Sequence, residues 1–409
     1  MLGLAKYLPE FGWQPIILTA PLDEKPDHRY RIVETGYQDA LGILGKLLKL
    51  NSGDDIRNQV KRRVGITSKK SFMDFVFTRA GEIINYPDAD KGWKGFAVKA
   101  GDKLISDEGI DAIISTSAPI TAHIIAHILK RRHEIPWIAD LRDLWSQNCN
   151  YYYSPIRKWF DRRLELRTLS TADALVTVSQ PLADKLGMLH KRKAYSITNG
   201  FDHETMNITP TELTAKFTIT YTGLIYPKKR DPSEFLVALR DLISVGYMDT
   251  KNIEVRFYGG YEGWLEKEIV ELGLSGIVHQ YGQVSREVAL QKQRESQILL
   301  FLDWDDSKEK GVIAGKIFEY MATGRPILSV GGSDDNAVTG ILEDTNSGIQ
   351  ATTIVGITDA LEDYYIQYHS QGRVARCGNE SSVKKYSQRE MARQFSETLA
   401  ILSYKTKGG

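Results

Sequence analysis

The chain has 409 residues, enough for two α/β domains with full hydrophobic cores. Its 53 basic and 52 acidic residues leave a formal net charge of +1, so composition gives no reason to expect a nucleic-acid partner. The two cysteines make no disulfide framework, and no apolar run is long enough for a membrane span or a signal peptide. We therefore expect a cytoplasmic protein that at most rests on the inner face of a membrane.

The first predicted elements are a helix over residues 1–12 and a strand over residues 13–19. Residues 41–80 then form a basic stretch in which nine lysines and arginines stand against three aspartates, with leucines and phenylalanines between them. Such a stretch can lie on an anionic lipid surface, and it can also be a helical insertion with a solvated basic face. We favour the membrane surface slightly.

A strand predicted over residues 110–115 leads into a helix that carries His123 and His127. A spacing of four residues between histidines can indicate zinc, but Ile124 stands where a zinc hydrolase needs glutamate. We therefore expect no metal at these histidines.

The buried strand predicted over residues 136–139 is followed by Asp140, Arg142 and Asp143. Open α/β sheets bind ligands at the carboxyl ends of their strands, which makes these three side chains candidates for a cleft. An internal Arg142–Asp143 ion pair that fixes the loop explains them equally well. Two further strands are expected at residues 174–179 and 194–198.

The second half of the chain repeats the strand pattern. Strands are predicted at residues 217–221, 253–259, 278–283, 298–302 and 326–330. The first of these is followed by Gly223 and by a basic cluster that includes Lys229 and Arg230. A glycine and several cations at the carboxyl end of a strand favour an anion site over a solvated loop.

Segment 311–330 is the most informative part of the sequence. Its helix is expected to begin near Gly315 and Lys316 and to end at Gly324. A helix N-terminus presents free N–H groups and a positive dipole end, and Lys316 adds a full charge, so a phosphate fits there. Glu319 lies one turn further along, within reach of a sugar diol. The pattern predicts a site for a nucleoside diphosphate.

An Asp-x-Asp sequence, Asp303 to Asp305, could hold a divalent cation at the end of strand 298–302. This pattern is common by chance. We expect instead that the charge on a leaving phosphate is neutralised by Lys229, Arg230 and Lys316, with neither a metal nor a cofactor.

Segment 311–330 resembles the donor-binding helix of retaining glycosyltransferases of family 4. These enzymes have the GT-B fold, in which two Rossmann-like parallel-sheet domains face each other across a cleft. The resemblance implies that Glu319 holds the donor ribose. The family motif has a second glutamate eight positions earlier, where this chain has Gly311.

The same resemblance implies further contacts. Gly223 and Gly315 would lie against the donor diphosphate, held by Lys229, Arg230 and Lys316. The backbone at Val284 would pair with the base. His123 matches a histidine that follows a serine-proline turn and contacts the donor sugar, while a buried core histidine is almost as good an interpretation.

The resemblance also implies a domain plan. We expect an acceptor-side domain over residues 1–200, a nucleotide-sugar-binding domain over residues 201–383, and a helix over 384–409 that crosses back to the first domain. The family has a strand and a glycine-rich loop before the first helix. Because this chain starts at the helix, we expect a truncated start.

The predicted function is transfer of a sugar from a nucleotide diphosphate sugar to a glycan or lipid-linked acceptor in cell-surface polysaccharide biosynthesis. The reaction is expected to retain the anomeric configuration and to need no metal. Two alternatives are a nucleotide-sugar epimerase on the same fold and a non-catalytic partner protein.

Overall fold

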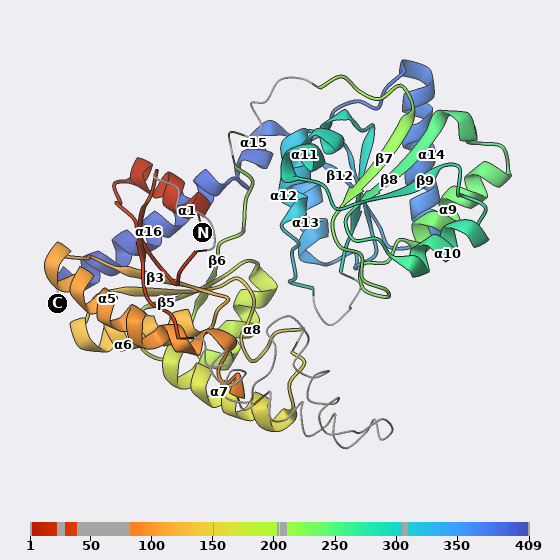
Figure 1. The fold of residues 1–409 in the computed structure, drawn as a ribbon. Coiled ribbons are helices and arrows are strands. Elements are labelled where there is room, and N and C mark those ends of the chain that lie inside the picture. The colour runs from red at the N-terminus through yellow and green to blue at the C-terminus, as the bar shows by residue number, and fades with distance from the viewer. Residues whose placement is uncertain are drawn as a thin grey trace, which may run out of the picture. The chain divides into compact units, whose positions relative to one another are not determined.

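The computed structural model describes residues 2–22, 29–38, 82, 84–149, 151–202, 204, 211–304 and 310–407. The basic stretch 41–80 lies outside these residues. The chain forms two compact units (Figure 1). Unit 1 contains Met1–Val178, Leu182–Ile197 and Arg393–Gly409, and unit 2 contains Ser179–Pro181 and Thr198–Ala392. None of the helices in the described part of the chain has the length and apolar character that crossing a bilayer requires.

Unit 1 holds two parallel sheets. One has the strand order β3-β4-β5-β6, and the other pairs β1 with β2. The elements are α1 (Leu2–Tyr7), η1 (Leu8–Phe11), β1 (Ile16–Thr19), β2 (Arg31–Glu34), η2 (Ala89–Trp93), α5 (Lys94–Glu108), β3 (Ile113–Ser117), α6 (Thr121–His133), β4 (Trp137–Leu141), α7 (Pro155–Leu169), β5 (Ala174–Thr177), α8 (Gln180–His190) and β6 (Ala194–Ser196).

The core of unit 1 forms around β4, all five residues of which are buried. The helix predicted over residues 1–12 is confirmed as α1 and η1, and it ends where Gly12 takes a left-handed φ of 84°. Strand β3 begins three residues later than the predicted residue 110 and continues to Ser117, so Ser115 lies in the strand rather than in the turn.

Unit 2 is built on one six-stranded parallel sheet. Its elements are β7 (Phe217–Thr222), α9 (Ser233–Ser244), η4 (Thr250–Asn252), β8 (Ile253–Tyr258), α10 (Gly263–Glu271), β9 (Val278–Gly282), α11 (Arg286–Glu295), β10 (Ile298–Leu302), α12 (Lys316–Thr323), β11 (Ile327–Val330), α13 (Ala337–Thr345), β12 (Gly348–Ala351), α14 (Ile354–Gln371) and α15 (Glu380–Lys384). The last helix, α16 (Gln388–Lys407), contributes residues to both units. The helix predicted from residue 384 therefore begins later, after a break at residues 385–387.

The strand order of unit 2 is β9-β8-β7-β10-β11-β12, which is the order of the Rossmann fold. Helices cover both faces: α9, α10 and α14 lie on one side of the sheet, and α11, α12 and α13 on the other (Figure 1). Strand β10 is buried throughout because its residues alternate between these two cores. Leu300 packs with the first group of helices, and Phe301 packs with the second.

Candidate functional site

The strand order of unit 2 reverses between β7 and β10, which are neighbours in the middle of the sheet. The connections leaving two such strands run to opposite faces, so the carboxyl ends of the strands open a crevice in which ligands of doubly wound folds bind. Gly223 follows β7 and Asp303 follows β10. The topology thus places the first residues of a site without reference to any ligand.

A buried hydrogen-bond network fixes the carboxyl end of β7. The backbone N–H of Thr222 donates to the Tyr320 hydroxyl on α12 at 2.9 Å. The side-chain amide of Gln293 on α11 donates to the Thr222 hydroxyl, also at 2.9 Å. Because all three residues are buried, these bonds hold the strand end and both helices in one geometry.

Lys316 packs directly on Gly223. A Cβ at position 223 would overlap the Lys316 Nζ, and Gly223 has a φ of 138°, which side chains rarely adopt. The Gly223 N–H donates to the carbonyl of Tyr258 at 2.6 Å. The Lys316 Nζ also lies over the ring of Tyr221, 5.1 Å from its centroid. Glycine is therefore required here both for the backbone and for the ammonium group.

The environment of Lys316 disfavours its charge. Burial and, to a smaller extent, the nearby Arg230 lower the pKa of Lys316 to about 8, whereas Glu319 acts in the opposite direction. A partly buried ammonium that is also repelled by an arginine is poised to receive an anion, because a bound anion restores the favourable partner that water supplied.

The predicted basic cluster is a tight turn after β7. The Arg230 N–H donates to the carbonyl of Tyr226 at 2.8 Å, and the Tyr226 N–H donates back to the carbonyl of Arg230 at 3.1 Å. The turn holds Lys229 and Arg230 over the ring of Trp304, at 5.2 and 5.6 Å from its centroid. Within the described residues, the buried Nε of Arg230 has no hydrogen-bond partner.

Helix α12 begins without a side-chain cap. Gly315 is its N-cap residue, and a Cβ there would meet no described residue within 4 Å. The space beside the first N–H groups is therefore open, and the packing of the protein does not itself demand glycine. The helix ends at Gly324, which takes the predicted left-handed conformation with a φ of 67°.

Glu319 is the acidic residue of the first turn of α12. Its carboxylate accepts a hydrogen bond from the Arg286 Nη2 at 3.1 Å. The side chains are 32% and 66% exposed, and an ion pair this exposed contributes little free energy, so a ligand can replace it at low cost. Arg286 begins α11, and Val284 lies two residues earlier, beyond the carboxyl end of β9.

Asp303 already has protein partners. Its carboxylate accepts from the side-chain amide of Asn336 at 2.7 Å and from the backbone N–H of Trp304 at 2.8 Å. Asp305 lies outside the described residues. Within the part of the chain that the structure describes, no three histidine, cysteine or acidic side chains are grouped as metal ligands would be.

The remaining predicted residues belong to unit 1. His123 is completely buried, and its Nδ1 lies 2.7 Å from the hydroxyl of Ser115, which also accepts from the indole N–H of Trp137. Burial lowers the pKa of His123 to about 3, so the ring is neutral. Its assignment as a contact to the donor sugar stays a prediction, because the side chain is closed to solvent in this structure.

The predicted alternative of an Arg142–Asp143 ion pair is wrong, because Arg142 pairs with a different aspartate. Arg142 instead donates to the buried Asp140 at 2.7 Å and to the carbonyl of Ile197 at 2.9 Å. Burial raises the pKa of Asp140, and Arg142 opposes this effect. Asp140 and Arg142 thus brace the strand ends of unit 1, while Asp143 is exposed.

The structure brings Gly223, Lys229, Arg230, Lys316 and Glu319 to one end of unit 2. Sequence reasoning missed the residues that hold them there, chiefly Tyr320, Thr222 and Trp304. Only the position of Tyr320, four residues after Lys316 on the same helix, could have indicated that the two act together.

The chain is similar to a family model over part of its length and to several solved structures over nearly all of it. Residues 85–194 match the model of the Glycosyl transferase 4-like domain. No curated protein sequence matches the chain. Among solved structures, sucrose-phosphate synthase from Thermosynechococcus elongatus is similar over 98% of this chain and 91% of its own, with a TM-score of 0.59 and 13% identity. Anabaena HepE, solved in complex with UDP, is similar over 94% of this chain and 100% of its own, with a TM-score of 0.57 and 14% identity.

A third similar structure is the alpha,alpha-trehalose 6-phosphate synthase from Burkholderia multivorans, with a TM-score of 0.58 and 11% identity over 99% of this chain and 93% of that one. At such identities the likeness concerns the fold. It confirms the predicted α/β fold of the GT-B type, built from two Rossmann-like units.

Proposed function

We propose that the protein is a glycosyltransferase that binds a nucleotide diphosphate sugar on unit 2. The observation that carries this proposal is the position of Lys316. Its ammonium group lies against Gly223 at the point where the strand order reverses, with its pKa lowered by burial and Arg230. The match of residues 85–194 to a glycosyl transferase domain and the UDP bound by the similar HepE structure support the same choice of ligand.

The contacts of the donor follow from the geometry of unit 2. The diphosphate would lie between Gly223, Lys316 and the uncapped N–H groups of α12, with Gly315 leaving room for it. Lys229 and Arg230 would approach from the turn after β7, where an anion would satisfy the Arg230 Nε. Glu319 would exchange its exposed ion pair for the ribose hydroxyls.

Transfer of a sugar from such a donor requires that the leaving nucleoside diphosphate be stabilised. When a nucleoside diphosphate departs, negative charge builds up on its phosphate. Fixed cations lower the activation barrier because they stabilise this charge more strongly in the transition state than in the ground state. Three fixed cations and a helix N-terminus can supply this effect without a metal ion. We propose retention of the anomeric configuration, with the leaving phosphate itself accepting the proton of the acceptor.

The acceptor is proposed to be a glycan or lipid-linked precursor of a cell-surface polysaccharide, and the enzyme is proposed to work in the cytoplasm near the membrane. An epimerase on this fold would convert the donor without an acceptor. A non-catalytic partner protein would bind the nucleotide, or nothing, and release no sugar.

A screen of nucleotide diphosphate sugars by thermal shift, followed by incubation with a radiolabelled donor, tests the proposal. We expect one donor to stabilise the wild-type protein and its label to be released or transferred. Lys316→Met should abolish both effects, whereas Lys267→Met, at an exposed position on α10, should abolish neither. Conversion of the donor to its epimer, or no stabilisation by any donor, would contradict the proposal.

A further inference from the structure

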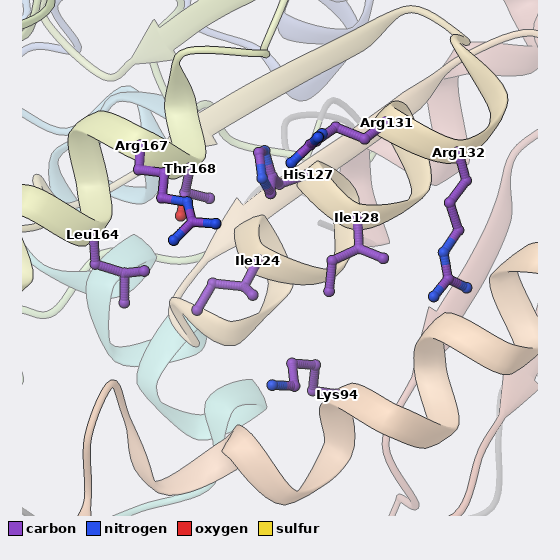
Figure 2. A pocket seen from close by; sticks show the side chains of 9 residues that line it. All are labelled: Lys94, Ile124, His127, Ile128, Arg131, Arg132, Leu164, Arg167 and Thr168. Carbon is purple, nitrogen blue, oxygen red and sulfur yellow. The ribbon is translucent and has the colours of Figure 1, made fainter.

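A cavity of about 570 Å³ lies on unit 1 between α5, α6 and α7 (Figure 2). Unit 1 alone provides its lining, so the cavity includes none of the candidate residues of unit 2. Nine residues line it: Lys94, Ile124, His127, Ile128, Arg131, Arg132, Leu164, Arg167 and Thr168.

The described residues of this lining are mostly basic, and none of them is acidic. Arg132 is ion-paired with Asp102, on the neighbouring helix α5. Lys94, Arg131 and Arg167, in contrast, make no ion pair with any residue that the structure describes. Three cations from three helices therefore surround one hollow with nothing in the described chain to balance them.

His127 is the titratable residue of the lining that lies close to two of these cations. It is half-buried, and its Nδ1 lies 2.7 Å from the hydroxyl of Thr171. Burial, followed by the charges of Arg131 and Arg167, lowers the pKa of His127. Both arginines are thus close enough to act on the same ring, and an anion bound between them would be attracted by both.

Apart from Thr168, the remaining lining residues are apolar. Figure 2 shows Ile124 between Lys94 on α5 and Arg167 on α7, with Ile128 next to Ile124 and Leu164 beside Arg167. A cavity for a small inorganic ion would not need apolar walls. Cations around an apolar surface fit an anion that is joined to an apolar group.

The outer face of α7 also combines exposed apolar side chains with arginine. Ile156, Trp159 and Phe160 are 73%, 53% and 50% exposed. The guanidinium of Arg163 lies over the Trp159 ring, 4.7 Å from its centroid. Helical spacing places Phe160, Arg163 and the cavity residue Arg167 along one stripe of the helix. Exposed aromatic residues mixed with arginines are typical of a surface that lies in the interface of an anionic bilayer.

We propose that this face of unit 1 binds an anionic phospholipid at a bilayer surface. The phosphate headgroup would enter the cavity between Lys94, Arg131 and Arg167. Trp159 and Phe160 would lie at the level of the headgroups and upper acyl chains. This inference depends neither on glycosyl transfer nor on the basic stretch 41–80, because it uses only described residues of three helices.

Flotation with vesicles tests the proposal. The full chain is mixed with vesicles of phosphatidylcholine alone or of phosphatidylcholine with phosphatidic acid, and we expect binding only to the second. The double variant Arg131→Glu/Arg167→Glu should bind at least about 30-fold more weakly, since each lost basic side chain contributes about 1 kcal/mol near an anionic surface and each glutamate adds repulsion. Trp159→Ala/Phe160→Ala should weaken the binding that persists at high salt.

A matched control separates the site from net charge. Lys99→Glu/Lys103→Glu makes the same charge change at exposed positions of α5 outside the cavity, and we expect it to alter binding less than threefold. Thermal unfolding confirms that each variant is folded, and Arg131→Gln/Arg167→Gln replaces the first variant if it is not.

Three results would overturn the proposal. They are equal losses of binding in the two charge-reversal variants, no preference for anionic vesicles, and stabilisation by inorganic phosphate or glycerol phosphate without vesicle binding. The last result would assign the cavity to a soluble phosphate compound.

Discussion

Replacing Lys316 with methionine distinguishes a ligand-binding lysine from a structural one. Burial and Arg230 lower the pKa of Lys316 from 10.5 to about 8. One pH unit corresponds to about 1.4 kcal/mol, so the folded state disfavours the charged amine by about 3 kcal/mol. This cost is fully present below about pH 8 and disappears as the pH rises through 10.5, because the lysine is then neutral in both states.

Methionine keeps the aliphatic stem beside Tyr221 and removes the charge. We therefore expect Lys316→Met to raise the free energy of unfolding at pH 7 by about 1 to 3 kcal/mol and to abolish stabilisation by UDP. The assay is urea unfolding with and without UDP, at pH 7 and again above pH 10.5. The free energy of unfolding is taken from the transition whose midpoint UDP shifts in the wild type. Lys267→Met is the control. A less stable Lys316→Met protein at pH 7, or one that UDP still stabilises as in the wild type, would refute the reasoning.

Three further predictions concern the same site. Glu319→Ala should leave the fold intact, since the ion pair with Arg286 that it removes is exposed. It should weaken donor binding at least tenfold by calorimetry, and unchanged affinity would remove Glu319 from the site. Gly223→Ala should displace the Lys316 ammonium and strain the backbone, so we expect a lower melting temperature and a loss of UDP binding. Wild-type values for both quantities would show that the close packing of Lys316 on Gly223 is unimportant. Transfer activity should persist in excess EDTA, because fixed cations neutralise the leaving phosphate; activity that disappears and returns with Mn²⁺ would assign a metal to Asp303.

The elements of unit 2 could be predicted because their local signals agree with the fold. Strand β10 has the predicted bounds, since a run of five apolar residues between polar ones is typical of a buried strand and too short for a typical helix. Gly324 ends α12 as predicted because it alone can take the left-handed conformation there without strain.

Side-chain partners could not be predicted in the same way. The contact of Lys316 with Gly223 joins residues 93 positions apart, and no sequence pattern encodes how deeply a lysine is buried. The pairing of Arg142 with Asp140 rather than Asp143 also depends on tertiary structure. Asp140 is a buried residue of β4, where an unpaired carboxylate would be costly, whereas Asp143 is exposed to water.

We propose that a nucleoside diphosphate binds where the strand order of unit 2 reverses. A crystal structure of the protein with UDP would locate this ligand. We predict density for the diphosphate within hydrogen-bond distance of the Lys316 Nζ and the first N–H groups of α12, with the ribose at Glu319. Density for UDP elsewhere in the protein, with Lys316 still packed on an unoccupied Gly223, would contradict the claim.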